Sequence, residues 1–389
     1  MRRTRLTAIV LALILALAGH QPARAADDIK IGVFLSVTGV MSLMGDPEKR
    51  TLDMLVDKIN AEGGIMGRNI QMILYDDGSE PEKATTFVKR LIDNDKVDII
   101  LGGSGTPTSM AVLNLIERAE MPYISMGGGV GIVDPVRKWV FKVPPTDRMA
   151  ADRVLAELKA RGLTKLAILS ENVGFGKSGH DHTVALASRH GVEVVADEVY
   201  SPKDPDVTPQ LTKIRATPGV QALFIFGSGN GPAVATKNIR QIGFNLPTYQ
   251  SPGVASREFL RLVGTAADGM RLAAGALIVA EQLPADNPQR PVVVTFKRMF
   301  EERNKPQDVS TLAGHGWDAL MIAIEAMKRA GGTDKAKVRD EIERTRGFIG
   351  TAGVVNMSPA DHLGLGDDAY HMIEVKNGDW ELSDHKYLK

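Results

Sequence analysis

Short apolar runs alternate with amphipathic segments along most of this chain, and the stretch 59–84 shows the pattern in full. An apolar helical face ends at Gly63-Gly64, where positive φ lets the chain reverse. A strand with apolar residues at alternate positions follows from Ile70 and ends in an Asp-Asp-Gly turn. Pro81 then opens the next helix, in a position where its missing N–H costs nothing. This stretch predicts one βαβ unit.

The alternation continues almost to the end of the chain. It predicts strands, with helices between them, at Lys30–Leu35, Ile70–Tyr75, Asp98–Leu101, Tyr123–Ser125, Lys165–Leu169, Glu193–Val199, Ala222–Phe226, Pro247–Gln250 and Met270–Leu277. Strands that alternate with helices are typical of parallel sheets covered on both faces. We therefore expect an α/β fold.

There are too many such units for one sheet, so we expect two lobes. Pro144-Pro145 cannot continue a strand or a helix and marks a crossing between them. The last third predicts consecutive helices, at Pro291–Arg303, Leu312–Ala330 and Lys335–Arg344. Helices without strands between them pack on an existing domain. The expected division, with three hinge crossovers, is a first lobe of residues 27–145 plus 274–350 and a second of 146–273 plus 351–389.

The first 26 residues have the features of a secretory signal peptide. Three arginines precede an apolar run at 6–18, which is shorter than the roughly 20 residues that span a bilayer. Ala23-Arg24-Ala25 then offers a cleavage site. We expect residues 1–26 to be removed and the mature protein to occupy the periplasm without membrane insertion. A retained membrane anchor is the less favoured alternative.

Composition narrows the classes of function further. The chain has no cysteine, which excludes disulfides, thiol nucleophiles, thiolate metal sites and a lipid attached at the cleavage point. Lysines and arginines balance the acidic residues at 47 each, so loss of the arginines in the signal peptide leaves a mildly acidic protein. That charge gives no reason to expect nucleic acid or anionic lipid as a partner.

Loops rich in glycine, serine and threonine follow several strands, where open parallel sheets bind their ligands. In the loop 102–109, Thr106 is a good N-cap residue and Pro107 a good first helical residue, so free amides point toward the cleft. With the hydroxyls of Thr106 or Thr108, and with Ser104 in the same loop, this segment suits a carboxylate. The alternative, weighted equally, is that Thr106 only caps its own helix.

The other loops add backbone and one aromatic ring. The glycines at 127–129 bring bare backbone near the cleft, or serve only a turn. Phe175 stands between two glycines and is a candidate to lie on a ligand, with a buried core position as the alternative. The loops 227–232 and 250–253 complete the set.

Signatures of enzymes are incomplete in these loops. Gly176-Lys177-Ser178 is similar to the end of a phosphate-binding loop, but Glu171 stands where the first glycine belongs. His180-Asp181-His182 lies on a predicted helix, where residues two apart point away from each other, so it does not predict a metal site. We expect no catalytic residues, metal or cofactor. An exported hydrolase is the remaining enzyme alternative.

Four motifs spread over the mature chain stand out together. They are Asn60-Ala-Glu-Gly-Gly-Ile-Met-Gly-Arg, Tyr75-Asp-Asp-Gly, Gly102-Gly-Ser-Gly-Thr and His315-Gly-Trp-Asp-Ala-Leu. The chain resembles the periplasmic leucine/isoleucine/valine-binding proteins of ABC importers. The resemblance implies a type I periplasmic binding fold of two Rossmann-like lobes, which closes over a small ligand and is presented to a permease and its ATPases. A sensor that presents its closed form to a membrane receptor is the alternative.

The resemblance also implies positions that bind the ligand. In relatives that bind α-amino acids, a hydroxyl residue matching Thr106, an amide matching Gly127 and a hydroxyl residue matching Gly129 hold the carboxylate. An aromatic residue matching Phe175 covers the ligand.

The positions that hold the ligand's ammonium group depart from the family pattern. The aromatic residue of amino-acid binders is replaced by Gly229 or Asn230, and the acid of the fifth loop by Pro252. Because a buried ammonium without an anionic partner is costly, we expect a ligand with a carboxylate but no required α-amino group. Aromatic or aliphatic acids are favoured over hydrophobic amino acids. Glu171 or Asp147 would restore amino-acid binding if either reached the cleft.

Overall fold

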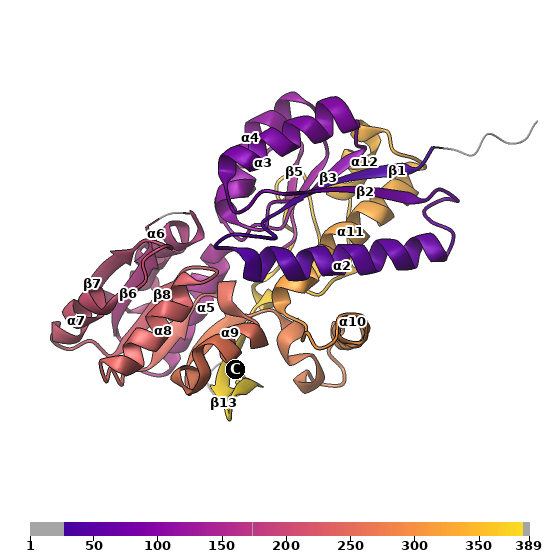
Figure 1. Cartoon of the computed structure of the whole chain (residues 1–389). Helices are drawn as coiled ribbons and strands as arrows, with labels where there is room; N and C mark the ends of the chain where they lie inside the picture. Colours follow the sequence, from indigo (N-terminus) through magenta and orange to yellow (C-terminus); the bar gives the residue numbers. More distant parts are fainter. Residues whose placement is uncertain (1–26, 173, 384–389) are drawn as a thin grey trace, which may run out of the picture.

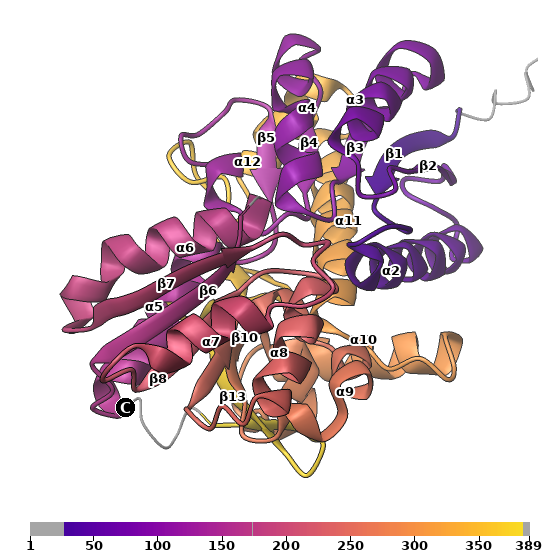
Figure 2. The same ribbon diagram turned by 60° about the vertical axis from the view of Figure 1, so that its left-hand side comes forward.

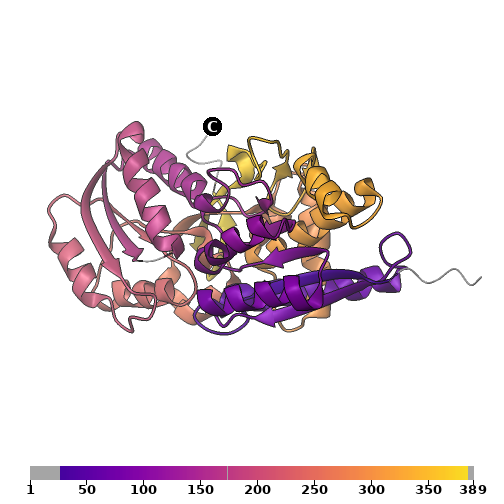
Figure 3. The ribbon, with the colours of Figure 1, turned by 90° about the horizontal axis from the view of Figure 1, so that it is seen from above.

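The computed structural model describes residues 27–172 and 174–383. The predicted signal peptide lies outside these residues. Figure 1 shows two lobes, one built from the N-terminal third together with the helices of the last third, and one built from the middle of the chain. Seen from above in Figure 3, the lobes lie side by side along the length of the molecule.

The first lobe contains a five-stranded parallel sheet in the order β2-β1-β3-β4-β5. Its strands are β1 (Ile29–Leu35), β2 (Ile70–Asp76), β3 (Ile99–Gly102), β4 (Tyr123–Ser125) and β5 (Val140–Lys142). Its helices are α2 (Ser42–Ala61), α3 (Pro81–Arg90), α4 (Thr106–Arg118), α10 (Arg290–Arg303), α11 (Thr311–Ala330) and α12 (Lys335–Glu343). Alternate residues of the central strands face opposite cores: Ile31 and Val33 pack with α2 and α11, whereas Phe34 packs with α3 and α4.

The second lobe contains a seven-stranded sheet in the order β14-β13-β10-β9-β8-β6-β7. Its strands are β6 (Lys165–Glu171), β7 (Glu193–Tyr200), β8 (Ala222–Phe226), β9 (Thr248–Gln250), β10 (Arg271–Ala274), β13 (His371–Lys376) and β14 (Asp379–Leu382). Its helices are α5 (Asp147–Ala160), α6 (Gly174–Ala187), α7 (Thr208–Ala216), α8 (Gly231–Gln241) and α9 (Arg257–Val263). Figure 2 shows α6 on one side of β6 and β7 and α7 on the other. Both sheets are thus covered on both faces, as the alternation predicts.

The chain crosses between the lobes near Pro144-Pro145 and again after β10, where Ala276 joins the core of the first lobe. The strands β11 (Phe348–Ile349) and β12 (Val354–Val355) pair with each other beside the first lobe. His362 still stacks on Phe141 of β5, with ring centroids 4.2 Å apart. These contacts favour a third crossing between His362 and β13, later than Thr351. The other boundaries of the lobes stay predictions.

The sequence analysis did not predict β5 or the four strands β11 to β14, and it extended one strand too far. β13 and β14 run antiparallel to their neighbours and form a hairpin around Asn377-Gly378, both with positive φ. The predicted strand Met270–Leu277 is wrong at its end, because β10 stops at Ala274 and a 3-10 helix, η6 (Ala276–Gln282), begins. Among the described residues, no helix is both long and apolar enough to cross a bilayer.

Candidate functional site

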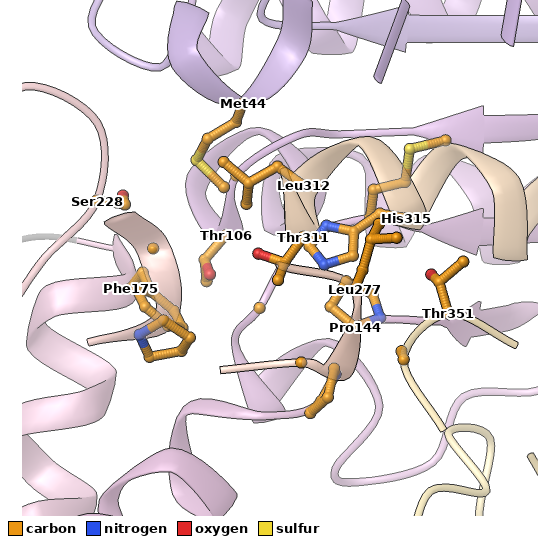
Figure 4. A pocket seen from close by; sticks show the side chains of 18 of the residues that line it. Met44, Thr106, Pro144, Phe175, Ser228, Leu277, Thr311, Leu312, His315 and Thr351 are labelled. Atoms are coloured by element: carbon orange, nitrogen blue, oxygen red, sulfur yellow. The ribbon is translucent and has the colours of Figure 1, made fainter. Parts of the chain in front are cut away.

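A pocket lies where the two lobes and their crossing segments meet (Figure 4). The space inside it, with its mouth and the open solvent there included, is about 630 Å³. Both lobes and the crossings contribute to its lining, which includes Met44, Gly105, Thr106, Met126, Gly128, Pro144, Pro145, Phe175, Ser228, Pro252, Gly253, Gly275, Leu277, Thr311, Leu312, His315, Thr351, Ala352 and Tyr370. Apolar side chains and hydroxyls therefore surround the space.

The lobes touch across this pocket, so the structure is a closed one. A Cβ atom on Gly128 of the first lobe would lie 2.6 Å from the ring of Phe175 of the second. On the other side of the cleft, a Cβ on Gly229 would lie 2.2 Å from the carbonyl oxygen of Val40. Glycine is needed at both positions because the facing surfaces approach too closely for a side chain.

Thr106 opens α4 and presents its hydroxyl in the pocket. Its Oγ1 accepts a hydrogen bond from the Gly129 amide at 3.0 Å, which leaves the hydroxyl hydrogen to donate elsewhere. A second helix, α11, begins at Thr311 in the same pocket. Two helix N-termini therefore reach this space, and such ends favour an anion. At α11, the Thr311 amide already donates to the Ala255 carbonyl and the Ala313 amide to the Ser310 hydroxyl, whereas α4 has no side-chain cap.

Three of the predicted site residues, Thr106, Phe175 and Pro252, line the pocket. Ser104 and Thr108 are buried and do not line the pocket. The Ser104 hydroxyl accepts from the Ser36 amide beyond the end of β1 at 3.1 Å, and the Thr108 hydroxyl donates to the Gly105 carbonyl at 3.2 Å. The alternative in which Thr106 only caps its own helix is wrong, because the N-cap position is Gly105 and no side chain caps α4.

The predicted glycines lie beside the pocket rather than in its lining. The amide of Gly127 donates to the Ser125 hydroxyl at 3.0 Å, and the amide of Gly129 donates to Thr106. Gly128, between them, lines the pocket.

In the loop 227–232 of the second lobe, the residue that lines the pocket comes just before the expected Gly229 and Asn230. Gly229 packs on Val40, Asn230 is exposed at the start of α8, and Ser228 lines the pocket instead. The family pattern pointed to the right loop but not to the right residue.

Several lining residues were not anticipated. Leu277, Thr311, His315, Thr351 and Tyr370 come from the crossing segments and from α11. One signal was available, because the motif at 315–320 contains a histidine two positions before Trp317. Trp317 in the same motif packs against the core of the first lobe.

The lining has almost no charge. None of the described residues that line the pocket is an aspartate, glutamate, lysine or arginine. His315 is the basic group, and burial, with the charge of Lys142, lowers its pKa to about 3, so it is neutral at pH 7. A ligand's carboxylate would meet hydroxyls and helix amides, whereas a ligand's ammonium group would meet no anion.

The two acids considered for an ammonium group do not line this pocket. Asp147 is fully buried, and its Oδ1 accepts from the Val130 amide at 3.0 Å. Glu171 lies beneath the loop 227–231 and accepts from the Ser228 amide at 3.2 Å. It borders an outer hollow that shares Thr106 and Phe175 with the pocket.

Replacing Glu171 by glutamine should remove part of the pH dependence of stability. Burial raises the pKa of Glu171 from 4.5 to about 8, so the folded state favours the neutral acid. Its contribution to stability is present below the unfolded pKa and is lost as the pH rises toward 8. As the pH rises from about 5 to about 8, the free energy of unfolding of Glu171→Gln, measured in urea, should increase by about 2–4 kcal/mol relative to that of the wild type. A constant difference across this range would contradict a neutral Glu171.

Comparison with known proteins gives consistent results. Residues 28–379 match the model of a family described as periplasmic binding protein. A leucine-, isoleucine-, valine-, threonine- and alanine-binding protein of Pseudomonas aeruginosa is 24% identical over 334 residues, which cover 84% of this chain and 86% of the relative.

Solved structures share the whole architecture. An extracellular ligand-binding receptor from Rhodopseudomonas palustris HaA2 is 30% identical, with a TM-score of 0.86, over 92% of this chain and 99% of that one. A solute-binding protein of an ABC transporter from Rhodopseudomonas palustris BisB5, solved with 3,4-dihydroxybenzoic acid, is 20% identical, with a TM-score of 0.78, over 92% and 96% of the two chains.

Proposed function

Because the chain belongs to the periplasmic binding protein family, we propose that it captures a small carboxylic acid between its lobes and delivers it to an ABC importer. The expected family and the type I fold are confirmed by the family match and by the solved structures. The related proteins are named as proteins that bind solutes. The ligand, the compartment and the membrane partners of this chain are our proposals.

The absence of charged side chains from the described lining of the pocket carries the choice of ligand. Thr106, Gly128 and the start of α4 offer hydroxyl and amide donors, which suit a carboxylate. An α-ammonium group would lose its hydration without gaining an anionic partner, which is costly. Phe175, Leu277 and Leu312 would contact an apolar body, aromatic or aliphatic.

The relatives support both kinds of acid. The protein from Pseudomonas aeruginosa is named for amino acids, and the one from Rhodopseudomonas palustris BisB5 was solved with an aromatic acid that has no amino group. The neutral lining of the pocket favours the second kind for this chain. The location that goes with this role is the periplasm, where the signal peptide would direct the chain.

A thermal-shift panel tests the proposal. The protein is first unfolded and refolded to remove any carried ligand, and is then mixed with leucine, isoleucine, valine, phenylalanine, benzoate, cinnamate and short-chain acids. Because a ligand that binds only the folded state stabilises it, an acid without an amino group should raise the Tm in a saturable way. A rise with the amino acids alone would contradict the proposal.

Removing one hydroxyl should weaken binding of the acid that the panel identifies. Thr106→Ala deletes a donor for the ligand's carboxylate, and we expect the Kd to rise about 10-fold in titration calorimetry. Thr106→Ser keeps the hydroxyl and is the matched control, with a change of at most about 3-fold. Equal losses in the two variants would show that the methyl group, and not the hydroxyl, matters.

A further inference from the structure

A buried acid stands directly behind one wall of the pocket. α2 and α11 pack closely where Gly316 has no side chain, and a Cβ there would lie 3.1 Å from the carbonyl oxygen of Glu48. This close packing brings Oε1 of Glu48 to 3.7 Å from Nδ1 of His315. Glu48 is fully buried, and within the described chain neither of its carboxyl oxygens, nor Nδ1 of His315, has a hydrogen-bond partner.

Burial opposes charge on both members of this pair. Burial raises the pKa of Glu48 well above its ordinary value and lowers that of His315. Asp77, beyond the end of β2, and Ser104 face Glu48, and the buried Lys142 of β5 faces His315. The charges of Asp77 and Lys142 both act in the same direction as burial, toward the neutral forms.

Glu48 packs behind the ring of His315, and the separation of their Oε1 and Nδ1 atoms is longer than a hydrogen bond. A neutral imidazole has one N–H donor and one acceptor nitrogen. His315 therefore offers the pocket an uncharged group that can form a hydrogen bond.

Figure 4 shows where the imidazole of His315 lies. The imidazole of His315 projects into the pocket beside Thr311 and Leu277, on the side of Thr351, whereas Thr106, Phe175 and Ser228 lie on the other side. The pocket thus has polar groups at two ends, with apolar side chains between them. A carboxylate at the Thr106 end leaves the His315 end to another part of the ligand.

We propose that His315 is a specificity residue whose neutral imidazole forms a hydrogen bond with a second, uncharged oxygen of the ligand. The inference rests on the proposed function and deepens it, because it names the ligand as a hydroxy or oxo acid. A second carboxylate fits less well, since the described lining of the pocket contains no cation to pair with it. A plain hydrocarbon end would leave the polar edge of the buried imidazole without a partner.

Matched pairs of probes test this assignment by titration calorimetry at pH 7. The probes are benzoate against its three monohydroxy isomers, and hexanoate against 6-hydroxyhexanoate. We expect wild-type protein to bind at least one hydroxy acid about 10-fold more tightly than its parent acid. His315→Leu should reduce that ratio to about 1–2, mainly by weakening the hydroxy acid.

Two further variants separate recognition from packing. His315→Gln keeps a side-chain N–H and should retain part of the preference. Glu48→Gln keeps a side chain of the same size behind the ring of His315 and should retain most of it. Because each ratio compares two ligands on one variant, a general loss of stability does not change it.

The outcomes distinguish the inference from the proposed function. If wild-type protein binds none of these acids, the proposed function fails and the inference with it. If it binds parent and hydroxy acids equally, or if His315→Leu keeps the preference, the proposed function stands and the inference is wrong.

Discussion

Replacing Gly128 by alanine should raise the Kd of the bound acid about 100-fold without unfolding the protein. The new methyl group would lie 2.6 Å from the Phe175 ring, which is buried and packs on Phe226 at 5.1 Å between centroids. Relieving such an overlap costs about 1–3 kcal/mol in a packed region. The overlap exists only when the lobes are together, so it disfavours closure and not the folding of either lobe. At about 1.4 kcal/mol per decade, a cost near the upper end of this range gives the 100-fold loss, which titration calorimetry measures.

Gly131→Ala is the matched control on the same loop. A Cβ at Gly131 would meet only Met110, at 3.9 Å, which is ordinary contact. We expect this variant to keep its affinity. Small-angle scattering should show the wild type and Gly131→Ala contracting when the acid is added, and Gly128→Ala remaining expanded. Equal affinities for Gly128→Ala and Gly131→Ala would mean that the bound state does not have this contact between the lobes.

Replacing Asp318 by alanine should lower the free energy of unfolding by about 3–5 kcal/mol. The carboxylate is fully buried and accepts three hydrogen bonds, from the Thr351 amide at 2.7 Å, the Thr351 hydroxyl at 3.0 Å and the Ala352 amide at 2.9 Å. Alanine would leave all three donors buried without an acceptor. Urea unfolding measures the change.

The same substitution should also weaken ligand binding, because Thr351 and Ala352 line the pocket. Asp318→Asn keeps one acceptor oxygen in the same place, and we expect a loss of only about 1–2 kcal/mol in stability. If the alanine and asparagine variants lost stability equally, the negative charge of Asp318 and not its hydrogen bonds would hold the segment 350–352.

The parts of the fold set by local pattern were predictable, and those set by the crossings were not. Alternating apolar residues placed β1, β2 and β8 within one residue of their ends. β5 has three residues, too few for a periodicity. The hairpin of β13 and β14 had a readable signal in Asn377-Gly378, because that pair favours the left-handed turn of a two-residue hairpin.

The residues that line the pocket were likewise predictable only in part. Thr106 was found because capping chemistry at a helix start is local, and Phe175 because glycines flank it. Thr351 and His315 reach the pocket only through the way that the last third folds back on the first lobe. Their sequence neighbours suggest a loop and a core helix, so no local rule assigns them to a site.

The most direct test of the proposed ligand compares acids that differ by one ammonium group. Titration calorimetry on refolded protein would compare 3-phenylpropanoate with phenylalanine, and 4-methylpentanoate with leucine. We expect that in at least one pair the acid without the amino group binds at least about 10-fold more tightly, because the described lining of the pocket contains no anion for an ammonium. Tighter binding of the amino acid in both pairs would contradict it, and would point to Glu171 as the partner of the ammonium group.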